Sequence, residues 1–183
     1  MEEIYIKKVI EGDEQGYRYI IRRYQDMAFS IAISVVKDEF LAEEVSQEAF
    51  MNAFEKMHTF KMQSKFSTWF YRIIINIAFR KLEKEKKWKN EPLVAVEESI
   101  DESHLDTLEQ DERKYFINEA LKLMSANESL ALRLFYLEEL SLSEVKDVTG
   151  WSNSKVKVVI HRARKSFYSY LNTLLKNESR LII

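Results

Sequence analysis

Glycine and proline are rare in this sequence: its 183 residues include only 3 glycines and 1 proline. A β-sandwich, a β-barrel or a series of βαβ units needs many tight turns, and these two residues are the ones that most often form them. Apolar residues recur instead at helical spacing, for example at Ile20, Tyr24, Met27 and Ile31. The sequence therefore predicts an all-α fold.

The residues that support catalysis or metal binding are few or scattered. The chain has no cysteine, and its histidines, His58, His104 and His161, are far apart, so a zinc site is not expected. It has no Gly-rich phosphate loop and no recognisable Ser/His/Asp set. We expect no metal, no cofactor and no catalysis by this chain itself.

Two further features bear on where the chain works. Residues 1–10 carry four charged side chains, so they lack the apolar core of a secretion signal. No stretch of the sequence reaches the roughly 18 apolar residues that a membrane helix needs. We expect a cytoplasmic protein with no membrane insertion.

The formal net charge is only −2, but the charges are segregated along the chain. Residues 38–50 contain five acidic residues and no basic one, and residues 91–112 contain nine acidic residues and no Lys or Arg. Residues 80–90 contain six basic and two acidic residues, and residues 151–168 contain five basic residues and no acidic one. A single block of this kind is commonly a solvated face, and that interpretation stays open for each. Four alternating blocks favour separate binding surfaces.

The first of two small helical domains is predicted at residues 1–90. Asp38 is placed as the N-cap of a helix whose apolar stripe includes Val45, Ala49 and Phe54. A gap at about Phe60–Ser67 separates this helix from a long one, apolar in its first turns and basic at its end. Residues 91–108 contain the proline and many acidic residues, which is typical of a linker.

The second domain is predicted at residues 109–177. The capping-box pairs Ser125 with Glu128 and Ser141 with Glu144 each predict the start of a helix. Gly150 suits the left-handed turn before a further helix that starts at about Asn153. Two helices joined by such a turn are typical of a helix-turn-helix. The second of them carries cations on one side and aliphatic residues on the other, as a recognition helix does.

Three motifs, in this order, resemble those of the extracytoplasmic-function (ECF) sigma factors of the sigma-70 family. They are DEFLAEEVSQEAF at residues 38–50, FKMQSKFSTWFYRIIIN at residues 60–76, and the helix-turn-helix with SEV at 143–145, Gly150 and HRAR at 161–164. The resemblance extends from Ile4 to Leu171. It implies a bacterial promoter-specificity subunit made of two helical domains and a linker, which works with core RNA polymerase.

The resemblance also implies which residues in the first domain bind which partner. The clamp helices of core polymerase would meet Asp38, Glu43, Glu44, Gln47, Glu48 and Phe50, and the flap would be a further polymerase contact. The minus-ten element would meet Lys61, Gln63, Ser64 and Lys65, in a loop that captures a flipped base, together with Asn76 and Arg80 on the following helix. A polar loop on a helical frame suits this task, because an unstacked base exposes its Watson–Crick edge.

In the second domain the resemblance implies contacts to the minus-thirty-five element. They would come from Lys155, Lys157, Val158, His161, Arg162, Arg164 and Lys165. The sequence departs from the family here, since Lys155, Val158 and Val159 stand where Thr, Ser and Arg are usual. The base-specific readout therefore does not carry over. Lys155 would contact a phosphate, and Val158 would touch a thymine methyl group.

Two partners and one alternative complete the expectations. Members of the family are commonly held inactive by an anti-sigma factor, so such a partner is implied. The acidic linker suits a basic channel in the polymerase, while a simple spacer is equally consistent with it. The alternative function is a stand-alone helix-turn-helix regulator, which would bind duplex DNA without polymerase. The net charge of −2 favours the sigma factor, because a chain with little net charge gains little from counterion release on DNA by itself.

Overall fold

The computed structural model describes residues 2–89 and 110–179, and within these ranges all regular secondary structure is helical, without a strand. This confirms the predicted fold class. The helices are α1 (Glu2–Ile10), α2 (Glu14–Val36), α3 (Glu39–Lys56), the 3₁₀ helix η1 (Met57–Thr59), α4 (Phe66–Lys89), α5 (Gln110–Leu123), α6 (Ala126–Leu132), the π-helical turn η2 (Arg133–Leu137), α7 (Leu142–Thr149) and α8 (Asn153–Ser179). The predicted linker, residues 91–108, lies outside the described residues. No helix in the described ranges is long and apolar enough to span a membrane.

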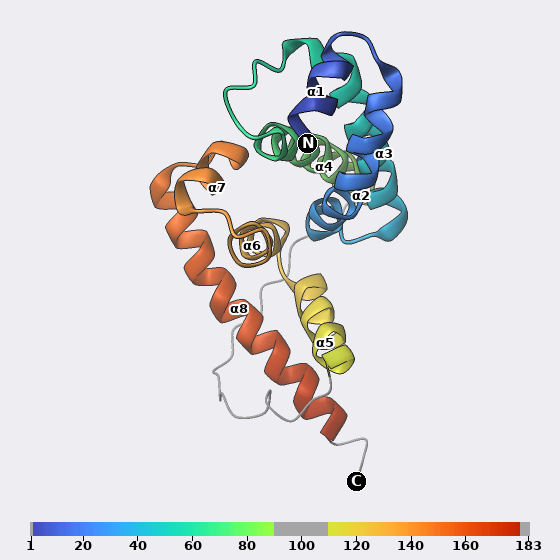
Figure 1. The fold of residues 1–183 in the computed structure, drawn as a ribbon. Coiled ribbons are helices and arrows are strands. Elements are labelled where there is room, and N and C mark those ends of the chain that lie inside the picture. The colour runs from blue at the N-terminus through green and yellow to red at the C-terminus, as the bar shows by residue number, and fades with distance from the viewer. Residues whose placement is uncertain (1, 90–109, 180–183) are drawn as a thin grey trace. The chain divides into compact units, whose positions relative to one another are not determined.

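The first of two compact units contains α1 to α4 (Figure 1). In it, α2, α3 and α4 pack against one another, and α1 packs on α2. Gly16 allows that close approach, because a Cβ there would lie 3.1 Å from Val9 Cγ2 and 3.3 Å from the Tyr5 carbonyl oxygen. The unit contains an aromatic cluster of Tyr24, Phe50, Phe66 and Phe70, of which all but the half-buried Phe50 are buried. Neighbouring ring centroids in it lie 4.8–6.2 Å apart.

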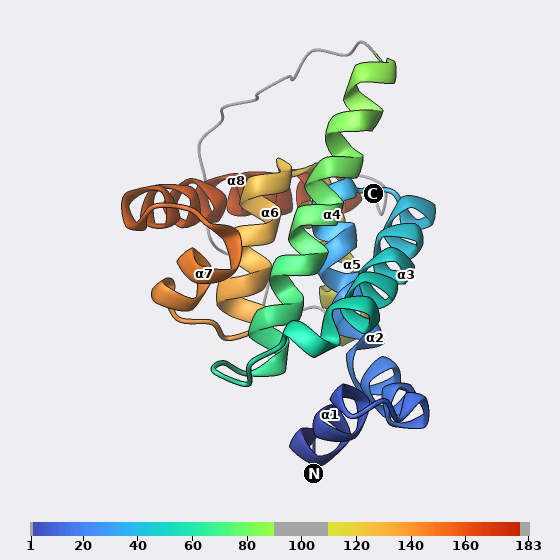
Figure 2. The ribbon, with the colours of Figure 1, turned by 90° about the horizontal axis from the view of Figure 1, so that it is seen from above.

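Local sequence signals set the ends of the helices in this unit. The Asp38 side chain accepts a hydrogen bond from the Leu41 amide at 2.8 Å and so begins α3, which confirms the predicted N-cap. The preceding residue, Lys37, ends α2 in the left-handed conformation with φ 62°. α4 begins at Phe66, next to the predicted Ser67, and its basic end extends beyond α2 and α3 (Figure 2).

The second unit is organised by α8, which packs along α5 and α6 (Figure 1). Its contacts with them include Leu171 and Leu175 beside Phe116, and Ala163 beside Leu121 and Leu132.

The predicted helix starts in the second half of the chain are confirmed. Ser125 caps α6, and its hydroxyl donates to Glu128 Oε2 at 2.8 Å. At the start of α7 the capping box is complete: the Ser141 amide donates to Glu144 Oε2 at 2.8 Å, and the Glu144 amide donates to Ser141 Oγ at 3.2 Å. Gly150 adopts φ 71°, and α8 starts at Asn153 as expected.

Candidate functional site

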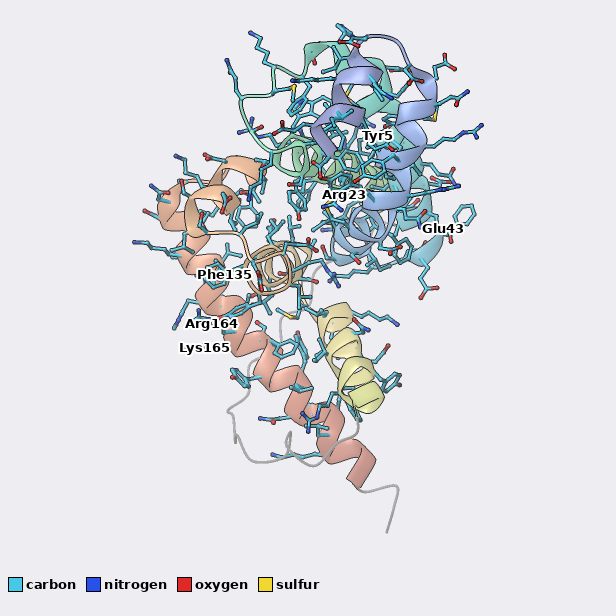
Figure 3. The ribbon with its side chains drawn as sticks, viewed as in Figure 1. Tyr5, Arg23, Glu43, Phe135, Arg164 and Lys165 are labelled. Carbon is cyan, nitrogen blue, oxygen red and sulfur yellow. The ribbon has the colours of Figure 1, made fainter. Side chains whose placement is uncertain are left out.

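The acidic side chains of α3 lie on its solvent side. Glu43 and Gln47, one helical turn apart, are exposed, and Figure 3 shows Glu43 on the outside of its helix. Glu44 and Glu48, also one turn apart, are half-buried, as is Phe50. The carboxylate of Asp38 is occupied in capping the helix. Five of the six residues predicted to bind polymerase therefore lie on α3, and the sixth, Asp38, is its N-cap.

The inner edge of this acidic surface is in contact with the basic part of α4. Lys81 Nζ lies 2.6 Å from Glu44 Oε2 and 3.7 Å from Glu48 Oε2, and Arg80 forms an ion pair with Glu48. Arg80 and Glu48 are residues that the sequence assigned to different partners. The pairing joins side chains 32 and 37 residues apart, so no local pattern indicated it.

An apolar groove of about 320 Å³ lies beside the acidic surface, between α2 and α3. Its walls include Tyr17, Ile21, Phe50, Met51 and Phe54, and Met51 and Phe54 are 64% and 40% exposed. The Tyr17 hydroxyl donates to the Phe50 carbonyl at 2.6 Å, and burial raises the pKa of this phenol, so it stays a neutral donor. Phe54 was predicted as part of the buried stripe. The structure places it at the groove, 40% exposed, whereas the adjacent Ala53 faces the core and is fully buried.

The loop before α4 borders a cavity of about 380 Å³. Ser64 and Lys65 line it, whereas Lys61 and Gln63 are exposed elsewhere in the same loop. Met62, which also lines the cavity, holds a left-handed φ of 55° and so turns the loop.

Five residues of α1 and α2 line this cavity, and none was predicted as a site residue: Glu2, Glu3, Ile6, Arg23 and Tyr24. The Tyr24 hydroxyl donates to Glu2 Oε1 at 2.8 Å, and Arg23 Nε donates to Glu2 Oε2 at 2.9 Å. Burial, followed by the hydrogen bond to Glu2, raises the pKa of Tyr24. The cavity thus offers a carboxylate, a guanidinium and hydroxyl groups, a donor and acceptor set suited to a polar planar ligand.

On α4 the two predicted DNA contacts, Asn76 and Arg80, are both exposed and one turn apart. Asn76 follows a run of isoleucines, and its exposure explains how the helix accommodates an amide there. Arg80 is oriented by Glu48 rather than free in solvent.

The seven residues predicted on α8 are all exposed: Lys155, Lys157, Val158, His161, Arg162, Arg164 and Lys165. Val156, Ile160 and Ala163 are buried, which confirms the predicted core side of the helix. Figure 3 shows Arg164 and Lys165 on the side of α8 that faces away from α5. Two aromatic rings, unpredicted from the sequence, lie beside these cations: Lys155 Nζ is 4.8 Å from the ring centroid of Trp151, and Arg164 Cζ is 5.4 Å from that of Tyr136.

Among residues 2–89 and 110–179, no group of three or more His, Cys, Asp or Glu side chains is arranged to hold a metal ion. The acidic side chains of α3 are instead arranged along a helix, two of them against cations of α4.

Comparisons with known proteins point to one family. Residues 20–88 match the family model described as Sigma-70 region 2. The ECF RNA polymerase sigma factor SigW of Bacillus subtilis is 27% identical to this chain, in an alignment that covers 92% of this chain and 96% of SigW. The RNA polymerase sigma factor YlaC of the same organism is 32% identical to this chain, in an alignment that covers 67% of this chain and 73% of YlaC. The sigma factor RpoE of Bartonella quintana, crystallised with the anti-sigma factor NepR, shares the fold with a TM-score of 0.67 at 20% identity, over 85% of this chain and 96% of that one. Residues 20–88 match region 2, and the sigma factors SigW and YlaC align with 92% and 67% of the chain. The chain therefore belongs to the ECF sigma factors of the sigma-70 family.

Proposed function

We propose that this chain is the subunit that binds core RNA polymerase and directs promoter recognition, DNA melting and transcription initiation. The observation that carries the proposal is the acidic surface of α3 beside an apolar groove, within the residues that match Sigma-70 region 2. In this proposal residues 1–90 bind polymerase and the minus-ten element, residues 91–108 are a linker, and residues 109–177 bind the minus-thirty-five element. The chain contributes binding surfaces, and the chemistry of transcription is that of the core enzyme.

The surface of α3 has the two components that a protein interface needs. The carboxylates of Glu43, Glu44 and Glu48 steer a basic partner and fix its register. The neighbouring groove, with Met51 and Phe54 exposed, supplies apolar area that a partner helix would bury. We assign this combined surface to the clamp helices of core polymerase, and the flap is a further expected contact.

The cavity beside the loop is the proposed site for the flipped base of the minus-ten element. Ser64, Tyr24 and Glu2 offer hydrogen-bonding groups at its wall, and capture of the base offsets the few kcal/mol that unstacking costs. Lys61 and Lys65 would contact phosphates, and Asn76 and Arg80, which are exposed on α4, would extend the DNA surface.

Filling this cavity tests its role. The substitution Ser64→Trp is expected to slow promoter melting at least about tenfold, because base capture would no longer offset the cost of unstacking. Permanganate reactivity of promoter thymines measures the melting. Binding to core polymerase should be unchanged, since Ser64 lines this cavity and not the groove beside α3. His58→Trp, a matched change at an exposed site in η1, should melt the promoter at the original rate, and equal rates for the two variants would contradict the assignment.

The exposed side of α8 is the proposed contact to the minus-thirty-five element. Its cations would neutralise phosphates, and Val158, which is 48% exposed, would touch a thymine methyl group. An anti-sigma factor is a further proposed partner, supported by the complex of the related RpoE with NepR.

Run-off transcription tests the whole proposal. Purified core polymerase is mixed with the full chain and genomic fragments, and the start sites are mapped. New start sites that depend on the chain and share two upstream elements are the expected result. A chain that ignores core polymerase yet selects a duplex target unaided would instead be the stand-alone regulator.

A further inference from the structure

Two of the exposed cations on α8 lie against aromatic rings that belong to other parts of the second unit. Lys155 Nζ is 4.8 Å from the ring centroid of Trp151, in the turn before the helix. Arg164 Cζ is 5.4 Å from the ring centroid of Tyr136, in η2. Both distances are within the range of about 6 Å in which a cation is attracted to the face of a ring.

Each of the two pairs has further contacts beside it within the second unit. The Lys155 amide donates to Ser152 Oγ at 3.2 Å, which forms the first turn of α8 directly after Trp151. The Tyr136 ring lies edge-on to Phe135 with centroids 4.9 Å apart. Ala163, the neighbour of Arg164, is fully buried against Leu132 at the end of α6. Figure 3 shows Phe135 and Arg164 near one another on this side of the unit.

A ring beside a long cationic side chain reduces the freedom that the side chain loses on binding. Lys and Arg each have large rotamer entropy, and a group already held near its bound position binds more tightly. We propose that Trp151 and Tyr136 are positioning residues that direct Lys155 and Arg164 toward DNA phosphates. This inference rests on the proposed function, in which the exposed side of α8 binds DNA.

Lys155 is the cation that would gain most from a neighbouring ring. It is the first cation of α8 and is exposed, and a phosphate contact from it would come from a long and flexible side chain. Trp, the ring type with the strongest attraction for cations, lies four residues before it, and the two side chains meet at the start of the recognition helix.

The test is a double-mutant cycle in the full chain, with a fluorescein-labelled DNA duplex of mixed sequence at low salt as the probe. Loss of a phosphate contact weakens binding about equally for all DNA sequences, so the promoter is not needed. Trp151→Leu and Tyr136→Leu are each expected to weaken binding about two- to fivefold, whereas Trp151→Phe and Tyr136→Phe retain a ring and most of the affinity. The leucine variants keep the salt dependence of binding, because they keep the cations, while Lys155→Met and Arg164→Met each lower its slope by about 1.

Crossing the variants separates positioning from a general effect on folding. In the Lys155→Met background, Trp151→Leu should have no further effect, but in the Arg164→Met background it should keep its full effect. Tyr136→Leu should show the reverse pattern. If the leucine variants weaken binding equally in both backgrounds, or leave it unchanged, the positioning role is overturned. If Lys155→Met and Arg164→Met leave the affinity and the salt slope unchanged, the proposed DNA surface of α8 fails as well.

Discussion

Reversing the charges of Glu44 and Glu48 together, to Lys, is expected to weaken binding of the chain to core polymerase by at least about 100-fold. Each reversal replaces an attraction by a repulsion, and like charges brought together at an interface cost several kcal/mol. The new lysines would also face Lys81 and Arg80, which now hold the two carboxylates. Fluorescence anisotropy of the labelled full chain, titrated with core enzyme, measures the loss.

A matched control has the same change in net charge on the same helix. Glu39 and Glu55 are exposed near the two ends of α3, and the double reversal Glu39→Lys, Glu55→Lys should weaken polymerase binding much less. Duplex DNA binding by the full chain should survive in both double variants, because α8 is unchanged. Equal polymerase affinity in the two would show that the carboxylates of Glu44 and Glu48 have no special place in the interface.

Truncating Phe70 to Ala is expected to destabilise the first unit by about 3–5 kcal/mol. The Phe70 side chain is fully buried, and its ring centroid lies 4.8 Å from that of Phe50 and 5.6 Å from that of Phe66. The loss is a large part of the total stability of a typical domain, about 5–15 kcal/mol. Urea unfolding followed by far-UV circular dichroism measures the change in the free energy of unfolding, taken from the transition whose midpoint shifts in the variant.

Phe40 provides the comparison for this truncation. It is 72% exposed on α3, so Phe40→Ala should change stability by no more than about 0.5 kcal/mol. The Phe70 cluster also supports both binding surfaces, since Phe50 borders the groove and Phe66 borders the cavity. Polymerase binding and promoter melting should therefore be lost together in Phe70→Ala. If Phe70→Ala were as stable as Phe40→Ala, the aromatic cluster around Phe70 would contribute little to the stability of the unit.

Several features of this fold were predictable because they depend on residues within one helical turn. The caps at Asp38, Ser125 and Ser141 involve side chains three residues from the amides they bind. Gly150 needed only its own freedom to adopt a positive φ. The buried side of α8 followed from the spacing of Val156, Ile160 and Ala163, which places them on one face.

The composition of the sites was predictable only in part. The acidic residues of α3 and the cations of α8 were identified as surfaces. The structure exposes Glu43 and the cations of α8, whereas Glu44 and Glu48 are half-buried beside Lys81. The cavity residues Glu2, Arg23 and Tyr24 carried no signal, because they reach the loop from helices about 40 or more residues away in sequence. Phe54 fitted a buried stripe by spacing, yet only the neighbouring helix determines where that stripe meets solvent.

By itself, the sequence determined that this chain is helical, where its main helices start, and that its charges form opposite surfaces on different helices, because periodicity and capping act over three or four residues. Only tertiary packing brings Lys81 and Arg80 to Glu44 and Glu48, forms the groove beside the acidic surface, and brings Tyr136 to Arg164 of α8. Most of these contacts depend on how helices pack against one another. Packing depends on the fit of whole side-chain surfaces, which no local pattern in the sequence specifies.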